Sequence, residues 1–214
     1  MMAKDYERIY QRDGLYWGEE PSELVKRFAE LAPQGKALDL GMGEGRDALY
    51  LASVGFGVTG VESTDSGVLK CERLAEQRRV SVHAVCEDVR DYRITKNRYA
   101  LIAAINLFQF MKKDEAEDVI ARVVDGLKRG GLFVCTTFTQ DDPSYKVRKQ
   151  KSKEVAPGVF LDASGNYYSL YHYGELLKLC SELRPIYYAE YDYYDTQHGP
   201  PHWHGVADFV GKKM

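Results

Sequence analysis

Apolar positions along the chain form short continuous runs, separated by stretches in which they recur every three or four residues. The continuous runs predict strands at 36–40, 56–61, 81–85, 99–105 and 132–137. The helically spaced stretches predict helices at 3–12, 21–32, 45–54, 65–79, 114–128 and 173–181. Two further strands are expected at about 185–194 and 203–211. This alternation is typical of an α/β fold, a doubly wound, mostly parallel sheet with helices on both faces.

Capping and helix-breaking residues set the expected ends of these elements. Ser22 is expected to cap the second helix. Asp114 is expected to cap the helix at 114–128, and Gly130 and Gly131 are expected to stop it. The stretch 140–166 is charged and contains two prolines and several turn-forming residues, so we expect irregular structure there.

Composition narrows the class of protein. The 214 residues, 44% of them apolar, suit one domain with a substantial core. A net charge of −3 disfavours a nucleic-acid binder, which usually needs a basic face. The cysteines form no C-x-x-C pair, which indicates free thiols in a reducing compartment. The start of the chain is too polar for a signal peptide and the longest apolar run is too short to span a membrane, so we expect a cytoplasmic protein without a membrane partner.

The most informative segment is ALDLGMGEGRDALYLA, from Ala37 to Ala52. A short apolar run ends in a turn with glycines at Gly41, Gly43 and Gly45, and a helical pattern follows. Glycine permits positive φ and lets a ligand approach the backbone closely. The first turn of the helix presents free N–H groups and a positive dipole end to that ligand. The segment therefore predicts a small-molecule cofactor site on a strand–turn–helix unit.

Residues around this turn discriminate between cofactors. A dinucleotide site has the spacing G-x-G-x-x-G, but the position of its third glycine is occupied by Arg46, and the chain has no G-K-[ST] for a P-loop. Glu62 ends the second strand, where a carboxylate can accept both hydroxyls of a ribose. Asp88 ends the third strand, where it could accept a hydrogen bond from an adenine amino group.

Five motifs together resemble those of class I S-adenosylmethionine-dependent methyltransferases. In chain order they are LDLGMGEGRDALYLA, VTGVE, CEDV, IAAINLFQFM and GGLFVCTTF. More narrowly, GRDALYLA and HGPPHWHGVADFVGKK are similar to the tellurite-resistance methyltransferase group. The resemblance implies a Rossmann-like, seven-stranded sheet whose final strand lies antiparallel between its neighbours. It also implies S-adenosylmethionine as cofactor and S-adenosylhomocysteine as product. Met42 replaces the cysteine common in this turn and Glu62 the usual aspartate, and both keep their physical role.

The resemblance implies a role for each matching residue. The pocket for the methionine part of the cofactor would be shaped by Asp39, Leu40, Gly41, Met42, Gly43 and Gly45. Glu62 would hold the ribose with Ser63 beside it, and Asp88 and Val89 would meet the adenine. Asn106 would lie near the methionyl group and the substrate. Each carboxylate also has a structural interpretation: Asp39 as a cap, Glu62 as a solvated strand end and Asp88 as a turn residue.

An aromatic segment precedes the first strand. It could cover the cofactor as a lid and exclude water, with Tyr10 and Trp17 as the expected contacts. Packing of an amphipathic helix is the alternative.

Two other groups of residues also have two interpretations each. Tyr187, Tyr191 and Tyr193 alternate on one strand face, which favours core or edge packing over a binding site. A basic run fits a solvated segment or a lid that attracts an anionic substrate; it consists of Lys146, Arg148, Lys149, Lys151 and Lys153.

Three histidines lie in a loop that the expected fold directs at the substrate. These are His198, His202 and His204, and the last two point to the same side of a strand. Three interpretations stay open. The loop could be a polar turn, or His202 or His204 could contact the substrate or act as a base. The third is a metal site completed by Asp192 or Asp195, which the neighbouring prolines make hard to close. We expect no metal site.

The sequence thus predicts methyl transfer to a small-molecule acceptor. The expected divisions are an N-terminal helical lid at 1–34, a cofactor-binding core at 35–138, a variable insert and helix at 139–184, and a terminal β pair at 185–214. A noncatalytic module that binds the same cofactor and a nicotinamide-dependent oxidoreductase are the alternatives. Enzymes that methylate DNA at amino groups typically carry N-P-P-Y or D-P-P-Y after the fourth strand, where this chain has INLFQF.

Overall fold

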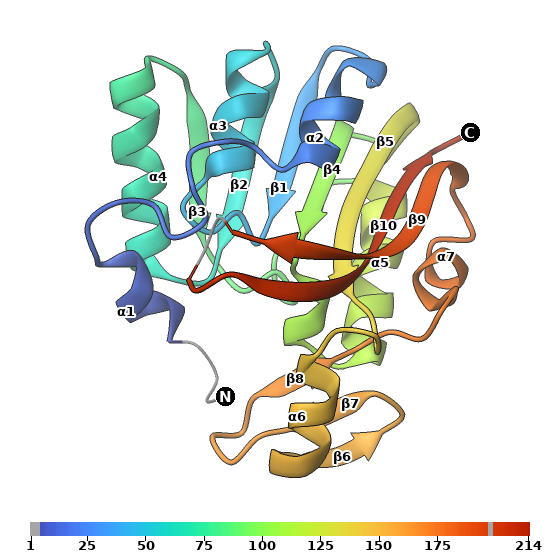
Figure 1. The fold of residues 1–214 in the computed structure, drawn as a ribbon. Helices are drawn as coiled ribbons and strands as arrows, with labels where there is room; N and C mark the ends of the chain where they lie inside the picture. The colour runs from blue at the N-terminus through green and yellow to red at the C-terminus, as the bar shows by residue number, and fades with distance from the viewer. Residues whose placement is uncertain (1–4, 197–198) are drawn as a thin grey trace.

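A computed structural model describes residues 5–196 and 199–214 (Figure 1). In this part of the chain, one sheet has the strand order β3-β2-β1-β4-β5-β10-β9. The strands are β1 (Lys36–Leu40), β2 (Gly57–Glu62), β3 (Val82–Cys86), β4 (Tyr99–Ile105), β5 (Leu127–Phe138), β9 (Arg184–Asp195) and β10 (His202–Lys212). The first five are parallel, and β10 inserts antiparallel between β5 and β9. The predicted fold class is confirmed, including the antiparallel final strand.

Helices cover both faces of this sheet (Figure 1). They are α1 (Tyr6–Tyr10), α2 (Glu23–Phe28), α3 (Arg46–Ser53), α4 (Asp65–Arg78), α5 (Lys113–Gly126), α6 (Ser144–Lys151) and α7 (Glu175–Leu179), with short 3-10 turns at Ala29–Leu31 and Phe108–Phe110. Helices α2, α3 and α4 pack on one face, whereas α5 and α7 pack on the other. Side chains of β1 alternate between these layers, so Leu38 and Leu40 join the α5 core.

The boundaries of α5 differ from the prediction. The helix begins after Lys112, whose backbone N–H donates to Glu115, so Asp114 is not the cap. It ends at Gly126, four residues before the predicted glycine stop. Gly130 and Gly131 lie instead within β5, at a break in register where Tyr99 pairs with Leu127 but Leu101 pairs with Leu132. The two glycines allow the backbone to form this irregularity, and Gly130 has a positive φ of +82° there.

Ser22 is the N-cap residue of α2, but its hydroxyl makes no capping hydrogen bond. Its backbone N–H donates to Asp47 Oδ1 at 2.6 Å instead. The start of α2 is therefore fastened to α3 by a tertiary contact.

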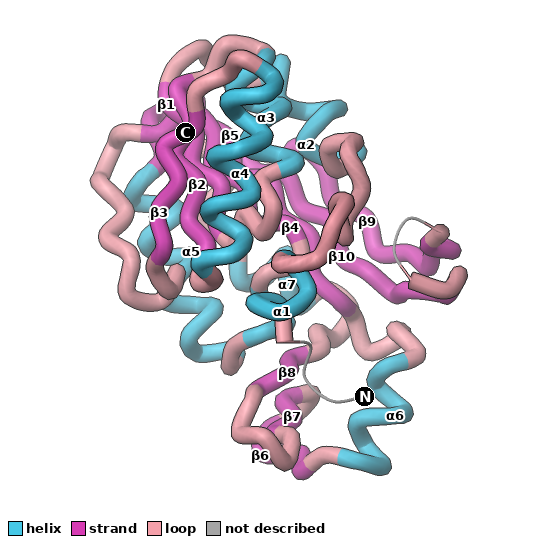
Figure 2. Tube along the Cα trace, turned by 90° about the vertical axis from the view of Figure 1, so that its left-hand side faces the viewer, coloured by secondary structure: helices cyan, strands magenta, loops and turns pink. Residues whose placement is uncertain are grey.

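The stretch expected to be irregular holds regular structure. Helix α6 is followed by a small antiparallel sheet of β6 (Lys153–Ala156), β7 (Val159–Leu161) and β8 (Tyr167–Ser169). Figures 1 and 2 show α6 and this sheet as a lobe beyond the carboxyl edge of the main sheet. The lobe has a small core of Phe160, Tyr168 and Leu170. Alternation over three residues is too short to indicate a strand in the sequence.

Within the described residues, no helix has the length and apolar character needed to cross a membrane. The division of the chain at 34/35, 138/139 and 184/185 stays a prediction. Strand β9 begins at Arg184 and β5 ends at Phe138, so two of these positions fall within a residue of element boundaries.

Candidate functional site

A cavity of about 1160 Å³ lies at the carboxyl edge of the parallel strands. It is lined by most of the residues predicted for the site: Tyr10, Trp17, Asp39, Gly41, Met42, Gly43, Glu62, Ser63, Asp88, Val89, Asn106, His202 and His204. In an open α/β sheet, ligands bind where the strand order reverses, which in this sheet is between β1 and β4. The cavity is therefore the candidate active site.

Two of the predicted residues do not line the cavity. Leu40 is fully buried in the α5 core, because alternate residues of β1 face opposite sides of the sheet. Gly45 is the N-cap of α3, with a φ of +90°. A Cβ on Gly45 would lie 2.4 Å from Cys71 Sγ, so this glycine allows close packing of α3 on α4. The assignment of these two residues to the cofactor pocket stays a prediction.

The turn between β1 and α3 lines the cavity with its backbone. Gly41 and Gly43 have φ values of +69° and +56°. The backbone N–H groups of Gly41 and Met42 both donate to the carbonyl of Val61, which fixes the turn on β2. A Cβ on Gly43 would lie 2.9 Å from the Tyr10 hydroxyl. A side chain at Gly43 would therefore project into the space between the turn and the aromatic segment.

The Glu62 carboxylate is buried at the end of β2 and is held rigidly. Oε1 accepts hydrogen bonds from the N–H and the hydroxyl of Thr64, both at 3.0 Å, and from the Ser63 hydroxyl. Among the described residues, Oε2 accepts one hydrogen bond, from the Gly43 N–H at 3.0 Å. A carboxylate oxygen has two lone pairs, so Oε2 can accept a further donor from a ligand. This geometry suits a ribose hydroxyl next to the glycine turn.

Asp39 supplies a second acceptor on the wall of the cavity. It is 2% exposed, and its Oδ2 has no hydrogen-bond partner within the described residues. Burial and then the nearby Asp47 raise the pKa of Asp39 well above its ordinary value. A buried acceptor without a partner is costly, and a ligand that carries a donor would satisfy it. The ammonium group of the expected methionine moiety is such a donor.

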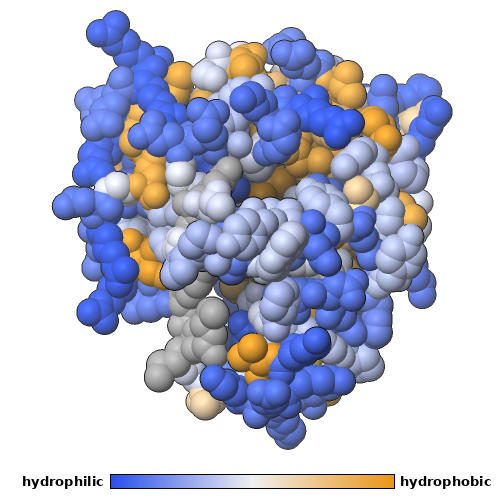
Figure 3. Space-filling model, in the orientation of Figure 1, coloured by the Kyte–Doolittle hydropathy of each residue, from blue (hydrophilic) through white to orange (hydrophobic). Residues whose placement is uncertain are grey.

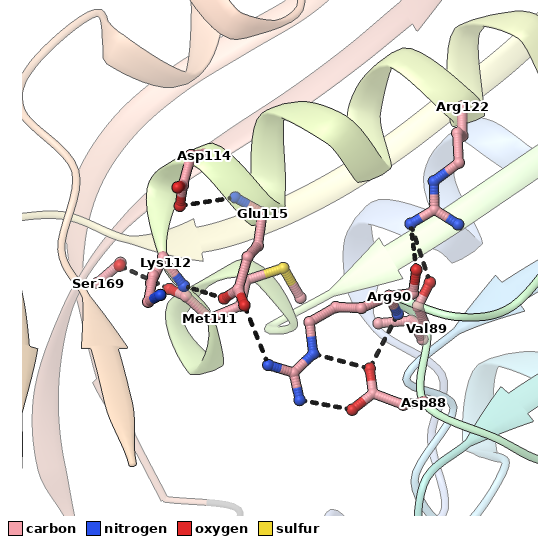
Figure 4. A network of polar contacts seen from close by, with 9 residues as sticks. All are labelled: Asp88, Val89, Arg90, Met111, Lys112, Asp114, Glu115, Arg122 and Ser169. Atoms are coloured by element: carbon pink, nitrogen blue, oxygen red, sulfur yellow. Dashed lines mark hydrogen bonds and ion pairs between the residues drawn. The ribbon is translucent and has the colours of Figure 1, made fainter. Parts of the chain in front are cut away.

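Asp88 is partly engaged by Arg90 (Figure 4). Oδ1 accepts from the Arg90 N–H at 2.8 Å and from Nε at 2.9 Å, and Oδ2 lies 2.6 Å from Nη2. These hydrogen bonds hold the pKa of Asp88 below its ordinary value, although burial opposes them. Arg90 also reaches Glu115 at 3.3 Å. The second lone pair of Oδ2 is the position at which an adenine amino group could bind.

Residues 10–17 close over the glycine turn through buried polar contacts. Trp17 Nε1 donates to the Tyr10 hydroxyl at 2.9 Å. Lys70 Nζ donates to Glu44 Oε1 at 2.7 Å and to the carbonyls of Arg12 and Gly14 at 2.9 and 2.8 Å. Glu44 Oε2 in turn accepts the backbone N–H groups of residues 16 and 17. This Glu44–Lys70 pair, 2% and 6% exposed, therefore anchors the predicted lid.

Sequence reasoning missed both members of this pair. A charged residue inside a glycine turn and a single lysine on an exposed helix are usually solvated. Only the fold shows that Glu44 and Lys70 are buried together.

His204 is oriented by a carboxylate from another part of the chain. Its Nδ1 lies 2.8 Å from Asp142 Oδ2, and its ring stacks on Phe138 with 4.6 Å between centroids. Burial alone would raise the pKa of Asp142, but hydrogen bonds from His204 and Ser144 outweigh it and hold that pKa below its ordinary value. The imidazole therefore has a fixed orientation at the cavity wall. Asp142 was missed as a site residue, although its segment was expected to face the site.

His202 lies beside His204, with 4.4 Å between ring centroids. Its Nδ1 lies 2.8 Å from the Pro200 carbonyl. His198 lies outside the described residues, so the interpretation that joins three histidines is not tested. Among the described residues, no three His, Cys, Asp or Glu side chains are placed to hold a metal ion.

The basic run is ordered where it meets the cavity. Arg148 and Lys151 of α6 line the cavity wall. The Arg148 guanidinium lies 3.3 Å from the centroid of the Tyr168 ring, a cation–π contact between α6 and β8. The run therefore forms part of the lobe at its cavity side, and its exposed members, such as Lys146 and Lys149, face solvent.

Comparisons with known proteins agree with this geometry. The family model described as "Tellurite resistance protein TehB" matches residues 10–148. A curated relative, the probable S-adenosyl-L-methionine-dependent methyltransferase TehB of Haemophilus influenzae (strain 10810), is 26% identical over 117 residues, or 54% of this chain. The match covers 41% of that relative, so the chain spans about two-fifths of the length of the curated protein.

Solved structures share the fold. The crystal structure of TehB from Haemophilus influenzae has a TM-score of 0.70 at 17% identity, covering 98% of this chain and 66% of that one. A Burkholderia thailandensis 1,6-didemethyltoxoflavin-N1-methyltransferase, solved with bound 1,6-didemethyltoxoflavin and S-adenosylhomocysteine, has a TM-score of 0.66 at 17% identity, covering 99% of this chain and 80% of that one. At this level of identity the likeness shows the fold alone.

Proposed function

Because the chain belongs to the TehB family of tellurite resistance proteins, we propose that it is an S-adenosylmethionine-dependent methyltransferase acting on a small-molecule acceptor. The observation that carries the proposal is the juxtaposition of an open glycine turn with two buried carboxylates. Gly43, Glu62 and Asp39 line one cavity, and Glu62 Oε2 and Asp39 Oδ2 each have acceptor capacity toward it.

The residues present fit the parts of the cofactor. Asp39 would accept the ammonium of its methionine moiety, and Glu62 the ribose hydroxyls. Asp88 and the buried Val89 would meet the adenine, and Tyr10 and Trp17 would cover the turn. When bound, S-adenosylmethionine supplies an electrophilic methyl group on a positively charged sulfur. The protein then has to align an acceptor with that methyl group, which alone can lower a barrier by about 7–11 kcal/mol in favourable cases.

His204 is the best-placed residue to serve the acceptor. It shares the cavity with Asn106, the residue expected near the methionyl group, and Asp142 fixes its ring. Because Nδ1 faces Asp142, the other ring nitrogen is the one that can take a proton from a neutral acceptor. An acceptor that is already anionic would need His204 only for positioning.

A small acceptor is supported by the surroundings of the cavity. Residues Tyr10 and Trp17 of the lid line one part of this cavity, and Arg148 and Lys151 of the α6 lobe line another. The chain has a net charge of −3, which does not favour nucleic acid as the acceptor. The absence of a nucleic-acid partner and the cytoplasmic location stay predictions.

Turnover of S-adenosylmethionine labelled in its methyl group tests the proposal. The purified chain is incubated with a panel of amines, thiols, hydroxyl compounds and metalloid oxyanions, and product methylation is counted. We expect transfer to at least one class, and His204→Ala should reduce turnover at least tenfold without changing cofactor affinity. Cofactor binding without turnover on any acceptor would favour the noncatalytic module, and binding of NAD(H) alone would favour the oxidoreductase.

A further inference from the structure

A second cavity, of about 530 Å³, lies between α2 and the β9–β10 hairpin. It shares Trp17, Arg46, Ile105, Asn106 and Tyr194 with the main cavity, so the two meet at the carboxyl end of β4. Figure 3 shows this face hollowed above the hairpin, with apolar surface inside the hollow. Since Asn106 is expected near the reactive end of the cofactor, a molecule in the second cavity would be next to the site of methyl transfer.

The floor of this cavity holds a buried carboxylate. Asp208 is 5% exposed and lies in the middle of β10, in register with Thr136 of β5. Its Oδ1 accepts the Thr136 hydroxyl at 2.6 Å, and its Oδ2 accepts the Tyr191 hydroxyl at 2.8 Å. Burial raises the pKa of Asp208, which shows that the pocket gives this charge less solvation than water would. A cationic ligand would supply the missing stabilisation.

A second acceptor points to the same kind of ligand. Asn106 directly follows β4 and adopts the left-handed conformation, with a φ of +53°. Its Oδ1 is buried and has no hydrogen-bond partner within the described residues. Its backbone N–H donates to the Thr136 carbonyl at 2.9 Å, which ties it to the strand that carries the Asp208 contact. An N–H donor in the cavity would satisfy this oxygen.

Tyrosine rings form the wall opposite α2. The side chains of Tyr187, Tyr191 and Tyr193 share one face of β9, and Tyr194 lies at the border with the main cavity. Tyr187 also packs against Phe28 and the core, as the sequence interpretation favoured, so the tyrosines combine packing at the sheet edge with lining of the cavity. Aromatic faces attract cations, so this wall favours a positively charged group over an anion.

The cations at this cavity are already engaged by the protein. Arg46 donates to the Trp17 carbonyl at 3.0 Å and approaches Asp47. Arg27 lies 4.9 Å from the ring centroids of both Phe28 and Tyr187. Lys26 pairs with Glu20 at 3.7 Å in solvent. Two buried groups of the cavity, the Asp208 carboxylate and Asn106 Oδ1, are acceptors, and the Thr136 and Tyr191 hydroxyls donate to Asp208.

We propose that this second cavity binds the protonated amino group of an organic amine, as a recognition subsite for the methyl acceptor. The buried Asp208 carboxylate and Asn106 Oδ1 accept its N–H groups, and the tyrosine wall packs against its cationic head. The assignment of the amine-bearing molecule as methyl acceptor, through a nucleophilic group other than its protonated nitrogen, rests on the proposed function, whereas the binding of the amine does not.

Three probes of one shape and different charge test the subsite: phenylethylamine, 2-phenylethanol and phenylacetate. Each is titrated by calorimetry into the full chain, alone and with saturating S-adenosylhomocysteine, and the tightest binder is located by crystallography. We expect the amine to bind at least tenfold more tightly than the alcohol, and the carboxylate to bind weakest. The nitrogen of the bound amine should lie within hydrogen-bond distance of Asp208.

Two variants and one control separate recognition from folding. Asp208→Asn keeps the shape of the side chain. It should weaken binding of the amine about tenfold or more and leave binding of the alcohol unchanged. Tyr194→Leu changes a residue of the tyrosine wall that is 54% exposed, and it should weaken binding of the amine a few-fold. Glu30→Gln, an exposed carboxylate outside both cavities, makes the same charge change as Asp208→Asn and should leave all three affinities unchanged.

The outcomes also distinguish this inference from the proposed function. Equal affinity for the three probes, tighter binding of phenylacetate, or an amine found away from Asp208 would overturn the subsite even if S-adenosylhomocysteine binds. Failure to bind S-adenosylhomocysteine with intact amine binding would overturn the methyltransferase assignment and leave the subsite standing.

Discussion

The two ends of the carboxyl edge are built in different ways. Around β1, β2 and β3, the residues that face the cavity lie at the ends of their strands or in the turns that follow, and Gly41 and Gly43 of the first turn have positive φ. Around β5, β9 and β10, the two cavities are lined by side chains that hydrogen-bond to one another, such as Asp142 with His204 and Tyr191 with Asp208. The first region suits a cofactor that is the same for every acceptor. The side chains of the second region can differ according to the acceptor.

This contrast determines how substitutions should act. A side chain added at a glycine of the turn occupies space that the cofactor needs. Cofactor binding is therefore either kept or lost almost completely. A side chain changed in the second region removes one contact among several, so the effect is graded and depends on the acceptor.

The largest expected effect concerns the lid anchor, the buried pair of Glu44 and Lys70 that holds residues 12–17. Lys70→Met leaves the buried Glu44 carboxylate without its ion-pair partner and should lower the free energy of unfolding by about 3–5 kcal/mol. Urea denaturation followed by circular dichroism measures the change. The double variant Glu44→Gln/Lys70→Met should recover part of the loss, because no unpaired charge then stays buried. A loss below about 1 kcal/mol in Lys70→Met would mean that the pair does not anchor the lid.

Gly43→Val tests the all-or-none behaviour of the glycine turn. Its φ of +56° disfavours valine, and the new side chain would meet the Tyr10 hydroxyl. We expect affinity for S-adenosylhomocysteine to fall more than a hundredfold, which is about 3 kcal/mol, with the fold retained. Gly57→Ala is the matched control, since Gly57 has no positive φ and open space around its Cβ position. Calorimetry that gives near-normal affinity for Gly43→Val would refute the assignment of the turn.

Glu62→Gln should have a smaller effect on the same ligand. The amide keeps the shape of the side chain but loses the charge that strengthens its hydrogen bonds to the ribose, so binding should weaken by about 1–3 kcal/mol. Glu72→Gln, an exposed residue of α4, makes the same change in net charge and should bind normally. If both variants bind alike, Glu62 is only a strand-end residue.

Asp142→Asn is expected to have the smallest effect on stability, about 1–2 kcal/mol at neutral pH, through loss of its hydrogen bonds to His204 and Ser144. Because the pKa of Asp142 is lowered in the folded protein, its contribution is present above the unfolded pKa and is lost as the pH falls through the folded pKa. The difference between wild type and variant should therefore begin to shrink once the pH falls below about 4, the ordinary pKa of an aspartate. Asp141→Asn, an exposed neighbour, should show no such pH dependence. A difference that persists in acid would assign Asp142 a role independent of its charge.

Local sequence patterns indicate the positions at the glycine turn and at strand ends, but they do not reveal contacts that depend on the tertiary fold. Gly41, Gly43 and Glu62 are placed by local rules, because a glycine turn after a strand and a carboxylate at a strand end are short-range patterns. Gly45 packs against Cys71, a contact that depends on how α3 meets α4 and that the glycine spacing does not reveal. Asp142 and Lys70 acquire their partners only through contacts 62 and 26 residues away along the chain, which no periodicity reveals. The strands of the small lobe are too short for their alternation to be distinguished from a loop.

The central claim is that the turn between β1 and α3 holds S-adenosylmethionine. A crystal structure of the chain grown with S-adenosylhomocysteine tests it most directly. The account predicts the ligand along Gly41 and Gly43, with its ribose hydroxyls within hydrogen-bond distance of Glu62 and its ammonium at Asp39. A ligand found elsewhere, or a turn filled by the side chains of the lid in crystals saturated with the compound, would contradict it.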